Sequence, residues 1–518
     1  MASKKKFYVT TAIDYPNAEP HIGHAYQKVL ADVLARWHKQ KGEDVWFLTG
    51  TDEHGKKVQE SAERAGKKPS RFVDELSVKF KDAWKALGVD YNRFIRTTDK
   101  DHEKLVQEVI KKSNDNGDIY LGEYEGLYCT GCEAYYTEKD LVDGKCPLHN
   151  RPLEVLKEES YFFRLSKYQD FLLDLYKKHP EFILPKERRN EIVNRVKEGL
   201  KDLSISRTSF DWGIKFPLGK GHIVYVWFDA LFNYVTGAGK DGEFWPADVH
   251  ILGKDNSWFH CVYWPAFLKS VGYDLPKTIL VNGFLTFNGK KISKSLGNAI
   301  SPVSLVEKYG VDAIRYYLCR NFVFGEDGDF SEGILVERYN NELANKLGNL
   351  VSRVAGLIEK NGVENVKKIV PPLPEKWKKD ILDGKIEIEQ ILINNPRGNI
   401  YTLTKKSEKG TESLLLDKYF NLRSNIEPIR LLVDRQIQTY QFDKALNIIF
   451  AFIDLCNEYV QESKPWKSGD KKVLYELKES ILKIADLLWP FIPEASEKIK
   501  KQFSAKSIKK GDILFKKI

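Results

Sequence analysis

FYVTTAIDYPNAEPHIGHAYQKVLADVLARWHKQKGEDVWFL, residues 7–48, determines the fold class of this 518-residue chain. Residues 7–13 are short and rich in β-forming side chains, and a segment with two prolines predicts a turn after them. Apolar residues then recur at helical spacing over 24–42, and residues 45–48 form a second apolar run. Strand, helix and strand in this order indicate a βαβ unit, and therefore a parallel, doubly wound sheet.

The strand and helix pattern is interrupted once and then returns. Residues 120–160 are rich in Gly, Cys and Tyr and show no helical stripe, whereas 222–227 and 249–252 are apolar runs that predict strands. We therefore expect a sheet that is split by an insertion. After Tyr339 the pattern becomes that of amphipathic helices, with a polar, loop-rich excursion predicted over 381–424.

Composition narrows the class of protein without defining it. The chain is 42% apolar and 12% aromatic, which is enough for several packed cores. Its net charge of +9 is mild for this length, so it fits a phosphate-bearing partner without requiring one. The lysines between 498 and 517 form either a solvated helix face or an RNA-facing patch. No run approaches the ~20 apolar residues of a membrane span, and Asp14 interrupts the first apolar run, so we expect a cytoplasmic protein without a membrane partner.

Two short motifs suggest that the protein handles phosphates. His21-Ile22-Gly23-His24 lies where the first strand passes into the first helix, which is where ligands bind in open α/β sheets. The helix N-terminus attracts anions, the imidazoles can donate to phosphate oxygens, and Gly23 leaves room for a nucleotide base. Alone, the motif fits capping or core histidines equally well.

The second motif is the lysine-rich run 288–295, NGKKISKS, in which a glycine predicts a mobile loop. Closely spaced ammonium groups can stabilise charge on a departing polyphosphate. By itself this run is more typical of a basic surface loop.

Together the two motifs resemble the HIGH and KMSKS signatures of class I aminoacyl-tRNA synthetases. The resemblance implies that an amino acid carboxylate attacks the α-phosphate of ATP, which enters with Mg²⁺, and that pyrophosphate leaves. His21 and His24 would then stabilise the pentacovalent phosphorus, while Lys291 and Lys294, with Ser293 beside them, would hold the β- and γ-phosphates. The acyl group would next pass to the terminal ribose of a tRNA.

Within that class the chain resembles the methionyl-tRNA synthetase family over nearly its whole length. The matching segments are 11–17, 50–55, 226–234 and 253–260. The resemblance implies an adenosine site with Gly253 and Asp255 and an L-methionine pocket formed by Ala12, Ile13, Tyr15, Asp52, Trp227, Ala230, Tyr234 and His260. The chemistry agrees, because aromatic faces attract a thioether and a buried ammonium needs a carboxylate such as Asp52.

Without the motifs, the two aromatic residues Tyr15 and Trp227 would be read as ordinary core residues and Asp52 equally well as a helix cap. Two positions depart from the family pattern. Asp14 replaces an aromatic residue or proline, and Asn256 replaces an aliphatic pocket residue.

Four residues have the spacing of a zinc site. Cys129 and Cys132 are separated by thirteen residues from the pair Cys146 and His149. Four such ligands suit tetrahedral zinc and leave no open position, so the spacing predicts one structural Zn²⁺. The pattern also resembles the single-knuckle, bacterial-type subgroup of the same family. The isolated Cys261, Cys319 and Cys456 are more typical of small core residues.

The resemblance assigns anticodon recognition to the helical C-terminal region, with Asn349, Arg353 and Trp466 as the reading residues. Unstacked bases need an aromatic plane and groups that bind their edges, although an exposed polar pair and a helix-end tryptophan would look the same. The expected partners are initiator and elongator tRNA(Met), bound by a monomer. The expected parts are a Rossmann-type catalytic domain in two halves at 1–116 and 201–270, a connective insertion with the zinc knuckle at 117–200, a KISKS-loop subdomain at 271–338 and an all-α anticodon-binding domain at 339–518.

Other interpretations stay open at this point. Synthetases for Val, Ile or Leu carry a much larger editing insertion, which the length of 518 residues excludes, and a cysteine enzyme would have zinc at its active site, against the knuckle pattern of this sequence. A tRNA-binding protein without catalysis, or an unrelated nucleotidyltransferase, is disfavoured by the intact His21, His24, Lys291 and Lys294.

Overall fold

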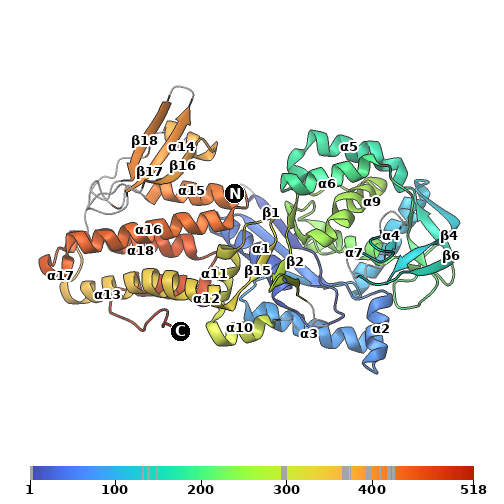
Figure 1. Cartoon of the computed structure of the whole chain (residues 1–518), viewed down its shortest axis with the longest axis horizontal. Coiled ribbons are helices and arrows are strands. Elements are labelled where there is room, and N and C mark those ends of the chain that lie inside the picture. Colours follow the sequence, from blue (N-terminus) through green and yellow to red (C-terminus); the bar gives the residue numbers. More distant parts are fainter. Residues whose placement is uncertain are drawn as a thin grey trace. The chain divides into compact units, whose positions relative to one another are not determined.

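The computed structural model describes residues 4–130, 134–136, 141–147, 150–292, 300–364, 373, 375–391, 400–407, 410–416, 422 and 426–518. The chain forms two compact units, which are Met1–Thr286 with Lys290–Val303 and Phe287–Gly289 with Ser304–Ile518. Figure 1 shows the elements of both units, which are described separately below.

A six-stranded parallel sheet forms the centre of the first unit. Its order is β3 (Arg93–Arg96), β2 (Asp44–Thr51), β1 (Lys6–Thr11), β11 (Val249–Gly253), β12 (Thr278–Asn282) and β7 (Ile183–Leu184). Val9 of β1 lies opposite Phe47 of β2 and Val249 of β11. The strands are nearly continuous apolar runs because helices cover a parallel sheet on both faces. The predicted split parallel sheet is confirmed.

Helices accompany this sheet, and α1 makes the predicted connection from β1 to β2. The helix starts at the residue after His21 and ends before Gly42, whose φ of +79° suits glycine. The helices of this unit are α1 (Ile22–Gln40), α2 (Lys56–Arg64), α3 (Pro69–Ala86), α4 (Lys100–Asp115), α5 (Gln169–Lys178), α6 (Lys186–Lys197), α7 (Val226–Leu231), α8 (Asn233–Thr236) and α9 (Trp264–Val271).

Between β3 and β11 the chain forms a second, antiparallel sheet. It contains β5 (Ala134–Tyr136), β4 (Ile119–Cys129), β6 (Glu154–Phe163) and β8 (Leu203–Ser204), in that order. The prediction of a strand over 222–227 is largely wrong. Only β10 (Ile223–Val224) is extended, pairing with β9 (Ser206–Arg207), and Val226 begins α7. A short helix that is buried on most sides has the same apolar pattern as a strand, so periodicity does not separate them.

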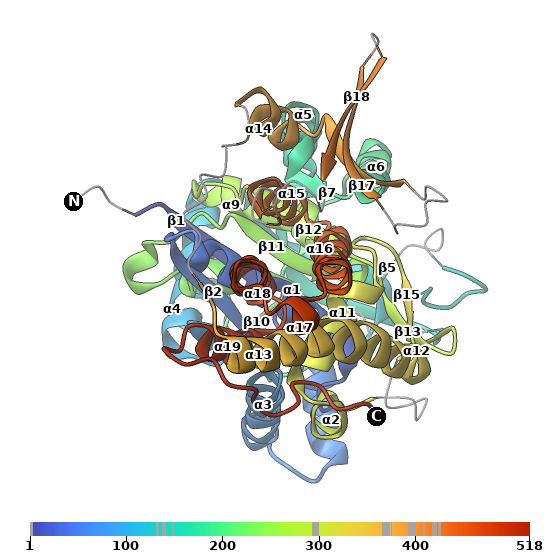
Figure 2. The ribbon, with the colours of Figure 1, turned by 90° about the vertical axis from the view of Figure 1, so that its left-hand side faces the viewer.

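The second unit is mainly helical, as predicted, and α13, α16 and α18 pack against one another in it. Figure 2 shows α16 and α18 end-on. Its helices are α11 (Val311–Asn321), α12 (Glu332–Arg338), η8 (Tyr339–Gly348), α13 (Asn349–Asn361), α14 (Glu375–Leu382), α15 (Ile426–Gln438), α16 (Phe442–Ser463), α17 (Pro465–Ser468), α18 (Lys471–Leu488) and α19 (Pro493–Phe503). The remaining elements of residues 285–330 are β13 (Leu285–Phe287), β14 (Lys290–Lys291), α10 (Pro302–Tyr309) and β15 (Gly328–Phe330). Of the helices described in either unit, none combines the length and apolar character that a membrane span requires.

The prediction of a loop-rich excursion over 381–424 is wrong where the structure describes that segment. It forms a three-stranded antiparallel sheet of β16 (Ile386–Ile391), β17 (Ile400–Ser407) and β18 (Gly410–Leu416). Ile388 pairs with Leu403, and Thr402 pairs with Leu415. The signal was the alternation of apolar and polar residues in Ile386–Ile391, which is typical of a strand.

Candidate active site

The two predicted histidines cap the N-terminus of α1 reciprocally. His21 has an extended backbone, and its Nδ1 accepts the Gly23 N–H at 3.2 Å. In return, the His21 N–H donates to Nδ1 of His24 at 3.1 Å, and the ring centroids lie 3.8 Å apart. A side chain at Gly23 would crowd this arrangement, because a Cβ there would lie 3.0 Å from the His21 ring. The capping interpretation and the phosphate-binding prediction are therefore compatible.

This capping fixes the tautomer of both rings. Since each Nδ1 accepts a backbone N–H, the proton of a neutral imidazole lies on Nε2, which can donate to an anion. Burial, together with the nearby Lys28 ammonium, lowers the pKa of His24 to about 3, so this ring stays neutral near pH 7. The first turn of α1, which the structure describes in full, contains no acidic residue. The helix end thus offers hydrogen-bond donors and a partial positive charge to a phosphate.

The carboxyl ends of three parallel strands meet beside this helix end. Directly after β1, the Ala12 N–H donates to the Ile251 carbonyl of β11 at 2.9 Å. Two residues later, Asp14 donates to the Gly50 carbonyl of β2 at 2.9 Å and accepts the Asp52 N–H at 2.8 Å. In the sheet, β2 and β3 lie on one side of β1, and β11 and β12 lie on the other. At such a reversal of strand order, open α/β sheets bind ligands in the crevice outside the carboxyl ends of the strands.

The predicted adenosine residues lie at the end of β11. Gly253 is the last residue of that strand, and Asp255 follows in a short helical turn. A Cβ at Gly253 would lie 2.7 Å from the Asp255 carboxylate and 3.2 Å from the amide nitrogen of Gln27 on α1. The strand end therefore approaches α1 closely, which glycine alone permits without displacement.

The predicted pocket residues gather around His260. Its Nδ1 lies 3.0 Å from the Asn256 carbonyl, which can only accept, so Nδ1 carries the proton. Nε2 then accepts the Tyr234 hydroxyl at 2.7 Å. Trp227 stands edge-on to this imidazole with centroids 6.1 Å apart and stacks on Phe259 at 3.7 Å.

The remaining pocket residues belong to the same cluster. Ala12 and Tyr234 are core residues of one apolar cluster, against which Ile13, Tyr15 and Trp227 pack while partly buried. Ala230 and Asp52 are buried. Burial raises the pKa of the Tyr234 hydroxyl, and the negative charges of Asp52 and Asp14 raise it further.

Two buried polar networks were not predicted. Asp229 accepts from His54 Nδ1 at 2.6 Å and from His102 Nε2 at 2.7 Å. Lys28 forms an ion pair with Asp14. The sequence held one signal for these networks, because Lys28 and Asp229 are charged residues within apolar runs that are expected to be buried. Their partners could not be identified, because they are distant in sequence.

The lysine-rich loop lies largely outside the described residues. Ser293 and Lys294 are not described, and Lys291 is described as part of β14 by its backbone alone. Where the chain is described again, the Ile300 carbonyl accepts the Ile22 N–H at 3.0 Å. The C-terminal end of the loop is thus attached to the first residue of α1, next to His21.

Half of the predicted zinc site is described. Cys129 ends β4 and Cys146 lies in a turn, and both are buried. The Cys146 N–H donates to the Arg151 carbonyl at 3.0 Å, and the Cys146 carbonyl accepts the Asn150 N–H at 2.8 Å. Cys132 and His149 lie outside the described residues.

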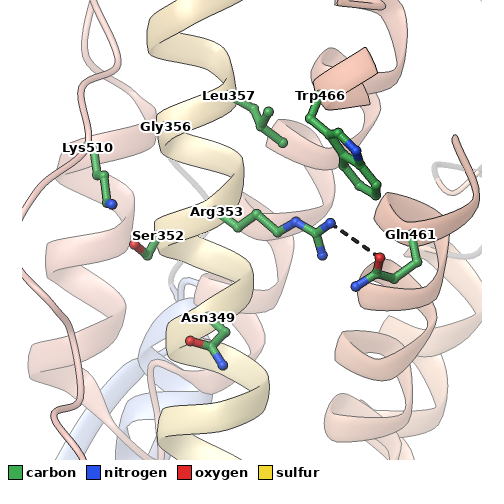
Figure 3. Close-up of a pocket in the computed structure, with 8 residues that line it drawn as sticks. All are labelled: Asn349, Ser352, Arg353, Gly356, Leu357, Gln461, Trp466 and Lys510. Atoms are coloured by element: carbon green, nitrogen blue, oxygen red, sulfur yellow. Dashed lines mark hydrogen bonds between the residues drawn. The ribbon is translucent and has the colours of Figure 1, made fainter. Parts of the chain in front are cut away.

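In the second unit the three predicted anticodon residues line one groove of about 640 Å³. The Arg353 guanidinium lies 4.5 Å from the centre of the Trp466 ring and donates to Gln461 Oε1 at 3.4 Å. Figure 3 shows these side chains converging, with Asn349 one helical turn from Arg353. Gln461, which was not predicted, lines the groove as well, and so does Lys510 of the lysine run 498–517.

Comparison with known proteins agrees with this arrangement. The family described as "tRNA synthetases class I (M)" matches residues 7–153 and 139–355, and "Anticodon-binding domain of tRNA ligase" matches 424–517. The methionine–tRNA ligase of Clostridium acetobutylicum is 44% identical, covering 97% of this chain and 74% of that protein. The Thermotoga maritima ligase is 42% identical, covering 96% and 75%. A Mycobacterium tuberculosis methionyl-tRNA synthetase in complex with methionyl-adenylate has a TM-score of 0.84 at 38% identity, covering 96% of this chain and 94% of that chain.

The split parallel sheet with its capped histidine helix, followed by a helical unit, defines a class I aminoacyl-tRNA synthetase. Within that class, the chain belongs to the methionyl-tRNA synthetase family. Enzymes of this kind activate L-methionine with ATP, which carries Mg²⁺, and transfer methionine from the adenylate to the 3′-terminal ribose of tRNA(Met). The predicted family and activity are confirmed.

Proposed function

We propose that His21 and His24 stabilise the α-phosphate of ATP while the methionine carboxylate attacks it. A bond forms between a carboxylate oxygen and the α-phosphorus, and the bond from that phosphorus to pyrophosphate breaks. The observation that carries this proposal is the reciprocal capping, which leaves Nε2 of both rings as the donor at the N-terminus of α1. Because His24 has a pKa of about 3, it acts by hydrogen bonding as a neutral ring.

Lys291, Ser293 and Lys294 bind the β- and γ-phosphates of ATP, which enters the site with its Mg²⁺. Support comes from the hydrogen bond between Ile300 and Ile22, which ties one end of their loop to the helix that carries the histidines. Gly253 and Asp255 bind adenosine at the end of β11, and Gly23 allows the nucleotide to approach α1. These residues would orient ATP for the reaction and stabilise the negative charge of its phosphates.

Asp52 binds the methionine ammonium, and a mainly apolar pocket holds the side chain. The aromatic faces of Tyr15 and Trp227 favour a thioether, and the linked Tyr234 and His260 present polar atoms at its end. Ala12, Ile13 and Ala230 complete the pocket wall. The small volume of the two alanines leaves room for an unbranched side chain.

Cys129, Cys132, Cys146 and His149 hold one structural Zn²⁺. The described half fits, because Cys129 and Cys146 supply two buried thiols of the kind that zinc binds. A bound ion would cross-link the tip of β4 to the turn and stiffen the insertion.

Asn349, Arg353 and Trp466 read the anticodon of initiator and elongator tRNA(Met) through stacking and base-edge contacts. We also propose that the protein is a cytoplasmic monomer. Its catalytic domain would comprise 1–116 and 201–270, its connective insertion 117–200, its KISKS-loop subdomain 271–338 and its anticodon-binding domain 339–518.

ATP–pyrophosphate exchange with each of the twenty amino acids tests the proposed site. We expect exchange with methionine and its loss in His24→Ala, with the fold retained by circular dichroism. Full exchange in His24→Ala would contradict the role of the histidine pair. Preference for another amino acid would contradict the assignment of the pocket.

A further inference from the structure

A buried ion pair lies directly beneath the proposed site. Nζ of Lys28 donates to Oδ1 of Asp14 at 2.8 Å and to the Ala12 carbonyl at 2.8 Å. The side chains are 0% and 5% exposed, and the ammonium lies 5.6 Å from the ring centre of the buried Trp84. The second carboxylate oxygen of Asp14 is buried without a hydrogen-bond partner among the described residues. Lys28 is therefore the residue that fixes the Asp14 side chain.

The segment that Lys28 holds is the one that shapes the amino acid site. Residues 12–14 lie between the ends of β11 and β2, and the Asp14 backbone accepts the N–H of Asp52. One ammonium thus fastens the chain between the proposed pocket residues Ala12 and Tyr15. Through the Asp14 backbone, Lys28 also fixes Asp52, which is proposed to bind the ammonium group of methionine.

Lys28 stands four residues after His24 on α1, so the two side chains share one face of the helix. Its charge acts on this histidine, since burial and the Lys28 ammonium together lower the pKa of His24. The same side chain therefore contacts the methionine segment and influences the phosphate-binding group.

Stability alone does not account for such a pair. Removing two charges from water is costly, and replacing a buried ion pair by apolar residues of similar size is often neutral or stabilising. Burial disfavours the charged form of both partners, which raises the pKa of Asp14 to about 6 and lowers that of Lys28. The pair is more easily explained by the geometry it imposes.

We propose that Asp14 and Lys28 are positioning residues for adenylate formation, which hold the methionine-binding segment 12–15 in register with α1 so that the substrate carboxylate faces the α-phosphate. This inference rests on the site proposed above. It assigns a role to Asp14, one of the two positions at which the chain departs from the family pattern.

The test replaces the pair by apolar residues. In the double variant Asp14→Leu/Lys28→Met we expect a melting temperature near that of the wild type. The kcat of methionine-dependent pyrophosphate exchange should nevertheless fall roughly 100-fold, because a displacement of about 1 Å between reacting groups has an effect of that order. The rate is expressed per active site, counted by a burst of adenylate formation.

The matched control uses another ion pair of the same helix. Arg36 Nε donates to Asp32 at 2.7 Å, and Asp32 lies about two helical turns after His24 on α1. The double variant Asp32→Leu/Arg36→Met should leave kcat per active site unchanged. A fall in kcat in this control equal to that of Asp14→Leu/Lys28→Met would show that any disturbance of α1 suffices, and would overturn the proposal.

A second variant keeps the proposal testable if the apolar pair does not fold. Asp14→Asn removes the charge but retains an oxygen for Lys28, so positioning predicts that it keeps most of the kcat that Asp14→Leu loses. Equal losses in both, or wild-type kcat in the double variant, would overturn the proposal. His24→Ala in the same assay separates the two hypotheses, since failure of positioning alone leaves His24→Ala inactive and the Asp14 and Lys28 variants active.

Discussion

The hydroxyl of Tyr234 lies 2.7 Å from Nε2 of His260, and the other ring nitrogen of that histidine lies 3.0 Å from the Asn256 carbonyl. This chain of hydrogen bonds has one direction, because the carbonyl can only accept. Tyr234 is therefore the donor to His260.

Tyr234→Phe tests this link. We expect the KM for methionine to rise about 3- to 10-fold, since a net hydrogen bond contributes roughly 0.5–1.5 kcal/mol, with little change in the KM for ATP. Pyrophosphate exchange at varied methionine concentration measures it. Tyr459→Phe, which loses a hydrogen bond to Glu476 in the second unit, is the control. An unchanged methionine KM would show that the pair is a core contact.

Lys294→Ala tests the lysine-rich loop. We expect adenylate formation to slow by orders of magnitude, because the ammonium proposed to stabilise the leaving pyrophosphate is lost. Affinity for a tRNA(Met) anticodon stem-loop should survive, since the anticodon residues are unaltered. Stopped-flow measurement of adenylate formation and a filter-binding assay give the two values. Wild-type turnover would refute the role assigned to this loop.

The sequence predicted the histidine motif because its determinants are local. A cap, a glycine and the start of an apolar stripe all lie within a few residues of His21. The strand predicted over 222–227 placed Trp227 in the wrong kind of element, since a short buried helix and a strand have the same apolar pattern. The neighbours of Asp14 and Asp229 were beyond prediction, because contacts such as His102 to Asp229 depend on how distant segments pack. The roles of the site residues stay predictions.

Cys146→Ser tests the zinc knuckle. We expect the purified protein to lose about one zinc per chain and to melt at a lower temperature, because four ligands are needed for a closed site. Metal analysis and thermal unfolding measure the two effects. Cys456→Ser, at an isolated buried cysteine, should keep the metal. Full zinc content in Cys146→Ser would exclude this ligand set.

The pair of His54 and Asp229 predicts a pH dependence of stability. Burial opposes both charges, but the Asp229 carboxylate outweighs it and raises the pKa of His54 above its ordinary 6.5. For Asp229, the His54 charge and the hydrogen bonds from both histidines likewise outweigh burial and lower the pKa. A raised histidine pKa gives stability that is complete below pH 6.5 and is lost as the pH rises through the folded-state value.

We therefore expect the melting temperature of the wild type to exceed that of His54→Gln by more at pH 6 than at pH 9. Differential scanning fluorimetry across this range provides the comparison, and subtraction of the variant removes titrations common to both proteins. A difference that stays constant with pH would mean that His54 does not titrate in this window.

Trp466→Ala separates tRNA recognition from catalysis. The indole is 40% exposed in the groove, and the Arg353 guanidinium lies over its ring, so the two side chains form a surface on which a base can stack. Stacking of one base contributes about 1–3 kcal/mol, so the KM for tRNA(Met) should rise roughly 5- to 150-fold while methionine-dependent pyrophosphate exchange stays at the wild-type rate. Aminoacylation and exchange assays on one preparation give both values. Trp377→Ala, at a partly exposed tryptophan on α14, is the control for loss of an indole outside the groove. Equal damage to exchange and aminoacylation in Trp466→Ala would mark this residue as a core residue of the helical unit.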